Sequence, residues 1–533
     1  MSTIPLLLQA EAAAHQRAVR STAYRHRHLS PKPLVVCIYN LSGEAAAPLA
    51  IAYGTSPKKL KIVVSAEPRN RESRFKAINE FAADLHAYIA PFLETETRQG
   101  GGRGKAQYEY LAAVDAPQIV VPNRATRDFL GARLGRSLRY LGLGDTHEVP
   151  EETVWAGAEL SWLADHAHYP GQSIFVAATE LLGRHFQTGQ SAFEDENLAT
   201  FLAWIDNVAG SGLDAIQIAE AGAPFGPVPD PQWESKLEPL VRDYTTALRA
   251  DDTSKMARAE KKVEALVRPP LTDAYAATHH ALEIMLAIPE SASSPSRWEA
   301  DLREWSGYCR RAARAIPRFR KRHDALLAAR RLESWGKALE HLEADEAFDD
   351  PLVMAEFDAD GQCLSGTVTA VDISNKEVKP GNVRQTLVPL ITLRLVAPTR
   401  LLPDAQVVWA SDRRVSGIIR AVPAVGATGD SVIAIMGGHS NGTAVPSKRD
   451  SALFVTLSPF QGNSPVEPTE VPWTHRPGDT EADSRLIADL AFLDATDAGA
   501  GADDGSSDLS GEELAALPLL GLVAPQDVPE VNL

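Results

Sequence analysis

The first 141 residues alternate between short hydrophobic runs and segments with helical spacing. Three strand-like runs come first, LVVCIY, PLAIAY and KIVVS, at 34–39, 48–53 and 61–65. A helical pattern follows over 71–89, and then a fourth strand-like run, QIVV, at 118–121. Asn123 is the expected N-cap of a second helix that runs to about Leu141. This order of three strands, a helix, a strand and a helix predicts an α/β domain with a mixed sheet.

The strand order resembles that of RNase H-like domains. The likeness is one of topology over about 110 residues, and a fold alone does not define a function. Nuclease chemistry on such a frame needs carboxylates on the first strand and at the end of the fourth, where they hold divalent metals. Here the first strand leads into Asn40 and the fourth leads into Pro122 and Asn123. The resemblance therefore implies a binding domain rather than a nuclease.

The rest of the chain changes character several times. Helical patterns fill 151–222, and GAPFGPVPDP at 222–231 is a linker with two Gly and four Pro. Helical spacing then continues to 348, with a predicted break at RPP (268–270), before short strand-like runs begin at VMAEF (353–357).

The sequence thus predicts a multidomain α+β protein. Its expected parts are a basic N-terminal arm (1–33), an α/β domain with a helical extension (34–222), a central helical bundle (232–348), a small β-barrel or sandwich (351–460) and a Pro-rich, then acidic, disordered tail (461–533).

Charge is unevenly distributed along the 533 residues. The formal charge of −17 hides two basic regions, 1–140 at +9 and 297–331 at +7, whereas 479–533 hold thirteen acids and one base. The overall acidity argues against nucleic-acid binding, but the basic regions restore it as a hypothesis. The alternative is that basic and acidic regions pair with each other inside the fold.

One candidate site is the Gly-rich segment GGGRGK at 100–105. A phosphate-binding loop needs Ser or Thr after its Lys and a strand before it, but Ala106 follows Lys105 and a helix is expected before the segment. We interpret it as a basic loop in which Arg103 and Lys105 contact a polyanion. The alternative is a solvated linker.

The helix after Asn123 has two distinct faces. One stripe is apolar and predicts the buried side, with Leu130, Leu134, Leu138 and Leu141. The opposite side carries an arginine at every third position, Arg133, Arg136 and Arg139. Such a row suits phosphate groups, and the alternative is an ordinary solvated surface.

The most basic run, 305–323, holds seven Arg and Lys and no acid. Its candidate phosphate ligands are Arg310, Arg311, Arg314, Arg318 and Lys321. The aromatic residues among them are Trp305, Tyr308 and Phe319. These rings either stack on bases or form the core face of a bundle helix.

Composition argues against membrane, secreted and metal-binding classes of protein. No 18-residue apolar window occurs and the N-terminus lacks a basic region before its short apolar run, so neither a membrane span nor a secretory signal is expected. Three scattered cysteines indicate a reducing cytoplasm. His279 and Glu283 share a helix face, but no third ligand follows at a telling spacing, so we expect neither a metal nor a cofactor.

The acidic tail contains a capping box, Ser510 to Glu513, before the apolar segment LAALPLLGLV. Its candidate partner-binding residues are Leu514, Leu517, Leu519 and Leu520. One hypothesis is that the acids occupy a basic surface in cis while this segment docks into a partner's apolar groove. The alternative is a solubilising extension.

Three functions follow from these patterns. The first is a non-catalytic, bacterial-type accessory protein that binds nucleic acid, DNA or RNA, and recruits a protein partner such as an ATP-driven nucleic-acid enzyme. The second is a divalent-metal-dependent nuclease with an RNase H-like domain. The third is a structural scaffold for protein–protein interaction whose charges are paired internally.

Overall fold

The computed structural model describes the chain with several gaps. The described residues are 3–41, 46–100, 107–141, 148–207, 212–222, 225–228, 231–319, 325–378, 384–424, 426–437 and 445–457. Of these, 3–319 and 330–457 belong to one compact unit, and 325–329 belong to a second unit.

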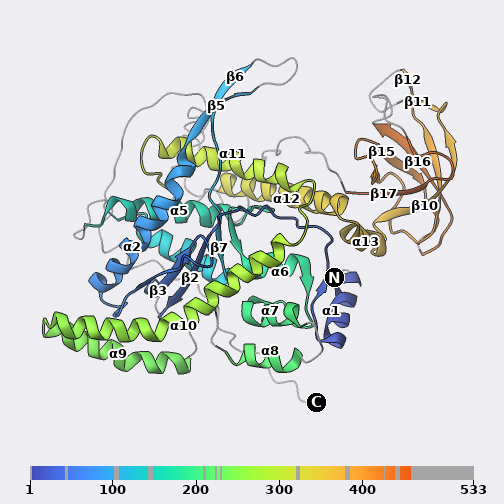
Figure 1. Ribbon diagram of the computed structural model, residues 1–533. Coiled ribbons are helices and arrows are strands. Elements are labelled where there is room, and N and C mark those ends of the chain that lie inside the picture. The colour runs from blue at the N-terminus through green and yellow to red at the C-terminus, as the bar shows by residue number, and fades with distance from the viewer. Residues whose placement is uncertain are drawn as a thin grey trace, which may run out of the picture. The chain divides into compact units, whose positions relative to one another are not determined.

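A five-stranded mixed sheet organises the first part of the chain (Figure 1). In sheet order its strands are β4 (Lys61–Val64), β3 (Pro48–Gly54), β2 (Leu34–Asn40), β7 (Ile119–Val121) and β8 (Phe175–Ala177). β2, β3 and β4 pair in antiparallel fashion, whereas β2, β7 and β8 run parallel. The mixed sheet predicted from the sequence is confirmed.

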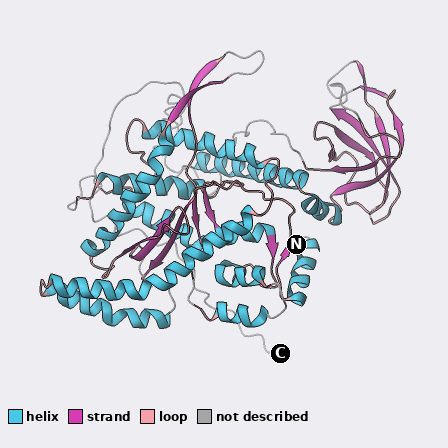
Figure 2. Cartoon of the chain, in the orientation of Figure 1, coloured by secondary structure: helices cyan, strands magenta, loops and turns pink. Residues whose placement is uncertain are grey.

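Helices cover both faces of this sheet (Figure 2). The central strand β2 must be covered on both sides because its side chains are apolar in both directions. All seven residues of β2 are buried. Because side chains alternate along a strand, Val36 and Ile38 join one core while Val35 and Cys37 join the other. A strand buried on both sides is a continuous hydrophobic run, as LVVCIY is.

The first face packs against helices from three parts of the chain. They are α2 (Arg71–Ile89), α3 (Arg124–Asp128), the π-helix Phe129–Gly135, α4 (Arg136–Leu138), α5 (Glu151–His166) and α11 (Ser294–Ala312). The Asn70 side chain caps α2 by accepting a hydrogen bond from the Ser73 amide at 2.9 Å. A Cβ on Gly131 would lie 2.4 Å from the Cβ of Ala164, so glycine allows the π-helix to approach α5 closely.

The second face packs against α6 (Ala178–His185), α7 (Leu198–Asp206), α9 (Pro231–Arg249) and α10 (Thr253–Leu286). The predicted break at 268–270 is wrong, because α10 continues through Pro269 and Pro270. A proline inside a helix costs about 3 kcal/mol. The fully buried Val263, Val267 and Leu271, which face the sheet on one stripe of α10, offset that cost.

The helices expected to form a bundle of their own are divided between the two sheet faces. The core that contains Val35 includes residues of α9 and α10, and the core that contains Val36 includes Trp305 and Tyr308 of α11. α10 and α11 therefore bury their apolar stripes on opposite faces of the sheet, whereas α9 packs mainly against α10. Helical periodicity predicted the helices but carried no information on which surface covers them.

The C-terminal region forms a closed six-stranded antiparallel barrel. In barrel order its strands are β10 (Cys363–Asp372), β13 (Leu390–Leu395), β16 (Asp430–Gly437), β15 (Ser416–Ala421), β14 (Gln406–Trp409) and β17 (Ser451–Val455). The alternatives of barrel and sandwich are thus decided in favour of a barrel. The run VMAEF is not a strand but part of α13 (Pro351–Ala359), because Asp350 caps this helix through the Leu352 amide and Pro351 fits its first turn.

The remaining helices and strands complete the described chain. They are α1 (Thr3–His15), β1 (Val19–Arg20), a 3₁₀ turn (Ala90–Leu93), β5 (Thr95–Gly100), β6 (Tyr108–Ala113), β9 (Phe186–Gln187), a 3₁₀ turn (Glu194–Glu196), α8 (Gly212–Glu220), α12 (Ala325–Asp349), β11 (Lys376–Val378) and β12 (Gln385–Leu387). No helix among the described residues has the length and apolar character needed to cross a membrane.

A buried carboxylate binds part of the N-terminal arm. Asp350 is 1% exposed and accepts hydrogen bonds from the Ala23 amide at 2.6 Å, the Tyr24 amide at 2.9 Å and His26 Nε2 at 3.3 Å. Burial raises the pKa of this carboxyl, but the bonds from His26 and the amides outweigh it and lower the pKa to about 2.

We expect Asp350→Asn to lower the free energy of unfolding at pH 7 by about 2–3 kcal/mol. A lowered pKa contributes stability above the unfolded value near pH 4, and this contribution is lost as the pH falls toward 2. The difference between wild type and variant in urea unfolding should therefore shrink between pH 5 and pH 2. Glu343→Gln, at an exposed position of α12, is the matched control and should change stability little. A pH-independent difference would contradict the assignment.

Candidate functional site

A two-stranded ribbon stands where the sequence predicted a Gly-rich loop. β5 and β6 pair in antiparallel fashion from Thr95↔Ala113 to Gly100↔Tyr108. Figure 1 shows the base of the ribbon beside α11, with the two strands extending away from the sheet. The segment before GGGRGK is thus a strand and not a helix, and a second strand follows. A phosphate-binding loop stays excluded, because that motif requires a helix after the loop.

Helix α11 anchors the base of the ribbon. The Ala113 amide donates to Ser306 Oγ at 2.8 Å, and Arg310 Nη1 donates to the Leu111 carbonyl at 3.0 Å. On its buried side α11 is fixed by Trp305, whose Nε1 donates to the Phe92 carbonyl at 2.8 Å. A two-stranded ribbon alone is marginally stable in water, so this anchoring explains how it forms.

The aromatic residues of the basic run belong to the core. Trp305 and Tyr308 are 0% exposed, and their rings stack with centroids 4.7 Å apart. Phe319 is partly buried against the same core. Of the two interpretations of these rings, the core face of a helix is therefore the correct one, and the first two cannot stack on bases.

The arginines of the same run face outward. Arg310 and Arg311 are exposed at the end of α11, which ends at Ala312, and Arg314 and Arg318 are exposed in the chain that follows. Arg310 lies at the base of the ribbon, and the other three exposed arginines follow it along the chain. The sequence that connects β5 and β6 holds Arg103 and Lys105. Arg103, Lys105, Lys321 and the tail residues Leu514, Leu517, Leu519 and Leu520 lie outside the described residues.

The predicted arginine row after Asn123 is present in part. The leucine stripe of this helix is buried, and Arg133 and Arg136 are exposed on the other side. Arg139 is only half-exposed, and its guanidinium lies 4.6 Å from the centroid of the Tyr140 ring. Two rather than three arginines are thus fully presented to solvent, on the same side of the sheet as α11.

Arg25 and two histidines of the N-terminal arm lie against acidic residues of the fold. Arg25 Nη2 lies 3.2 Å from Glu290 Oε2, and His28 Nδ1 lies 3.4 Å from Glu290 Oε1. His26 is bound to Asp350, as described above. Arg25 therefore fits the alternative of self-complementary charge, whereas Arg17 and Lys32 of the arm are exposed, as are arginines of α11 and of the helix after Asn123.

An RNase H-like frame needs carboxylates at the first and fourth strands. The corresponding strand ends here hold two buried asparagines, Asn40 at the end of β2 and Asn123 after β7. The side-chain oxygen Oδ1 of Asn40 accepts a hydrogen bond from the Ala47 backbone amide at 3.0 Å. The backbone N–H of Asn40 donates to the Pro227 carbonyl at 2.7 Å. Asn123 Oδ1 accepts from Thr126, and its Nδ2 donates to the Gly226 carbonyl at 3.0 Å. Residues 225–228 thus lie across the carboxyl ends of β2 and β7. Their carbonyl groups accept hydrogen bonds from the Asn40 backbone and the Asn123 side chain.

Gly226 makes this close contact possible. Its φ of +85° is a conformation that favours glycine. A Cβ at this position would lie 2.4 Å from the Ile38 carbonyl oxygen of β2. The linker predicted at 222–231 therefore has a second role, because it covers the sheet edge at which ligands of open α/β sheets commonly bind.

Other groups capable of catalysis are engaged or shielded. Burial raises the pKa of the thiols of Cys37, Cys309 and Cys363 to about 12, so none is a ready nucleophile. His166 Nε2 bonds Asp301 at 2.8 Å, and both side chains are buried. The described residues contain no group of three or more His, Cys, Asp or Glu side chains arranged to hold a metal ion.

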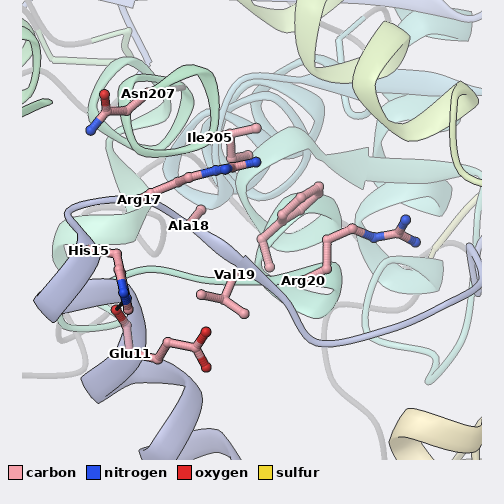
Figure 3. Close-up of a pocket in the computed structure, with 9 residues that line it drawn as sticks. Glu11, His15, Arg17, Ala18, Val19, Arg20, Ile205 and Asn207 are labelled. Atoms are coloured by element: carbon pink, nitrogen blue, oxygen red, sulfur yellow. Dashed lines mark hydrogen bonds between the residues drawn. The ribbon is translucent and has the colours of Figure 1, made fainter. Parts of the chain in front are cut away.

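An open groove of about 610 Å³ lies between α1, the β1–β9 pair and the end of α7. Figure 3 shows Glu11 and His15 on one side of it, with Arg20 turned away from them. The Arg20 guanidinium is bound to the carbonyls of Thr22 and Ala23, both at 2.9 Å. The groove offers mixed charge on exposed side chains and no convergent catalytic set.

Comparison of the chain with protein-family models, with curated proteins and with solved structures finds no match in any of the three. The geometry of the site is therefore the basis for a functional proposal.

Asn123→Asp tests the covered sheet edge. The variant keeps the acceptor for Thr126 but turns a carboxylate oxygen toward the Gly226 carbonyl, so we expect the free energy of unfolding to fall by about 1–3 kcal/mol. We also expect no magnesium-dependent cleavage of a labelled oligonucleotide. Asn70→Asp, at the N-cap of α2, keeps its acceptor for Ser73 and should be nearly neutral. Cleavage gained by Asn123→Asp would favour the nuclease hypothesis instead.

Proposed function

We propose that the protein is a non-catalytic nucleic-acid-binding accessory protein. Its binding surface is the base of the β5–β6 ribbon together with the end of α11. The observation that carries the proposal is the set of exposed arginines, Arg310, Arg311, Arg314 and Arg318, in a run without any acid. Arginine donors in such density suit the phosphates of a nucleic-acid backbone, and they supply affinity without reading sequence.

The frame supports binding over cleavage. The sheet order β4-β3-β2-β7-β8, with β3 antiparallel to its neighbours, agrees with the resemblance to RNase H-like domains, on which we base the proposed fold family. At the two strand ends where that chemistry needs carboxylates, Asn40 and Asn123 are bound to neighbouring backbone groups and to the 225–228 segment. Asparagine side chains whose groups are already hydrogen-bonded neither ligate a divalent cation well nor act as general bases.

The acidic tail suggests how binding is regulated. Thirteen acids and one base in 479–533 match the opposite charge of 297–331, so we propose that the tail competes with nucleic acid in cis. The apolar segment that contains Leu514, Leu517, Leu519 and Leu520 is then the proposed contact for a protein partner, such as an ATP-driven nucleic-acid enzyme.

Replacement of Arg311, Arg314 and Arg318 by Ala should weaken binding and flatten its salt dependence. For each phosphate of duplex DNA that the variant no longer neutralises, the slope of log K against log salt changes by about 0.9. Fluorescence anisotropy over a salt series measures both quantities. Arg310 is left in place because it binds the Leu111 carbonyl at the base of the ribbon.

The matched control replaces three exposed basic residues, Arg242, Arg249 and Lys255, by Ala. They lie on α9 and α10, on the other side of the sheet. This control changes net charge equally and should leave the slope unaltered. Equal effects of the two triple variants would show that net charge, not this surface, governs binding. Absence of binding at low salt by the wild-type protein would favour the structural scaffold.

A chain that ends at Gly478 should bind nucleic acid more tightly than the full chain at low salt. The deletion removes a net charge of −12, and the gain should fade as salt screens the competing acids. A full-length variant with the thirteen acids changed to Asn or Gln is the control for deletion itself and should behave like the shorter chain. Equal affinities of all three proteins at low salt would exclude competition in cis.

A further inference from the structure

One face of the β5–β6 ribbon carries two exposed aromatic rings. Tyr108 is 61% exposed and Tyr110 is 36% exposed. Because they are two residues apart on one strand, both side chains lie on the same face of the ribbon. Their ring centroids are 5.9 Å apart with an interplanar angle of 42°. Large aromatic side chains at an exposed ribbon gain little from the fold, which indicates a ligand.

The paired strand β5 places a glycine opposite Tyr108, so no side chain covers that ring from β5. Tyr108 is paired with Gly100, and a Cβ on Gly100 would lie 2.5 Å from Tyr108 Cζ. The Tyr108 ring therefore lies against the backbone of β5 on one side and is open to solvent on the other. Tyr110 is paired with Arg98, which places a cation on the same face.

Cations near the two rings come from one strand residue and from the ribbon base. The strands β5 and β6 hold one base, Arg98, and two acids, Glu96 and Glu109. Arg98 Nε is paired with Glu96 at 2.8 Å, and both side chains are exposed, so solvent weakens that pair. The exposed Arg310, whose Nη1 donates to the Leu111 carbonyl, adds a second cation at the ribbon base.

We propose that Tyr108 and Tyr110 stack on the bases of a single-stranded nucleic acid whose phosphates contact Arg98 and the arginines at the end of α11. The proposal rests on the proposed function and names its substrate class. Unpaired bases offer free ring faces, whereas duplex bases are already stacked on one another, so exposed rings favour the single strand. Stacking is tolerant of sequence, so no base preference follows from these two residues.

The test uses the full-length protein and fluorescence anisotropy. The probes are a labelled oligothymidine of about 20 nucleotides, longer than a typical single-strand site, and a duplex of equal length. Tyr108→Ala and Tyr110→Ala should each weaken binding of the single strand about tenfold, and the double variant more, with duplex binding nearly unchanged. Tyr→Phe at both positions keeps the rings and should retain single-strand affinity.

Two controls separate stacking from damage to the ribbon. Tyr→Leu at both positions keeps apolar cover over Gly100 without a ring, and should lose single-strand affinity as the Ala variants do. Leu111→Ala alters an exposed residue of the same strand on the opposite ribbon face and should have no effect.

The outcomes distinguish this inference from the function on which it rests. If the wild-type protein binds both probes but the tyrosine variants lose duplex and single strand equally, or lose neither, stacking is wrong and binding stands. If Leu replaces Tyr without loss, the tyrosines act as apolar cover and the inference is overturned. If the wild-type protein binds neither probe at low salt, the proposed function itself fails.

Discussion

The fold of the described chain depends on a buried carboxylate, Asp350, which joins segments far apart in the sequence. It holds the amides of Ala23 and Tyr24, bonds His26, and caps α13 through the Leu352 amide at 2.9 Å. Its neighbour Asp349 accepts from Arg413 in the loop between β14 and β15 at 2.6 Å. A charge taken out of water is tolerated only when its acceptor positions are filled, and here they are. The N-terminal arm and the barrel are thus fixed to the same turn of chain.

This arrangement also divides the positive charges of the protein into two classes. Arg25 pairs with Glu290, and His26 and His28 lie against Asp350 and Glu290, so these three residues of the arm make contacts that stabilise the fold. The arginines at the end of α11 have no comparable role in the described contacts apart from Arg310, which holds the ribbon. Surface guanidinium groups cost little to keep in water, and they remain free to exchange counterions for phosphates. The charge pattern of a sequence cannot make this distinction, because it depends on which acids the fold brings near.

Local patterns predicted four of the five strands of the sheet, but β8 lies in a segment for which helices were expected. The runs at β2, β3, β4 and β7 are continuous apolar segments, so their strands and the mixed sheet followed from the sequence. The β5–β6 ribbon was missed because the glycine tract dominated the interpretation, although Thr95, Thr97, Tyr108 and Tyr110 alternate as strand residues do. Trp305 and Tyr308 were open to two interpretations because a helix face that packs on a sheet and one that meets a ligand have the same periodicity. Only the observed burial of the rings decides between them.

The covered edge of the sheet and the exposed ribbon are physically linked. At the carboxyl edge of the sheet, residues 225–228 occupy the space in which an open α/β sheet would hold a ligand, and Gly226 fits there because no side chain would. A ligand must therefore bind elsewhere, and the ribbon inserted between α2 and β7 offers a surface that the core does not use. Its anchor, α11, buries Trp305 and Tyr308 on one side and presents arginines at its end, so the rigid core positions the charges. Under the proposed function, a ligand at Tyr108, Tyr110 and Arg310 meets side chains that the core already holds in place, which lowers the entropy cost of binding.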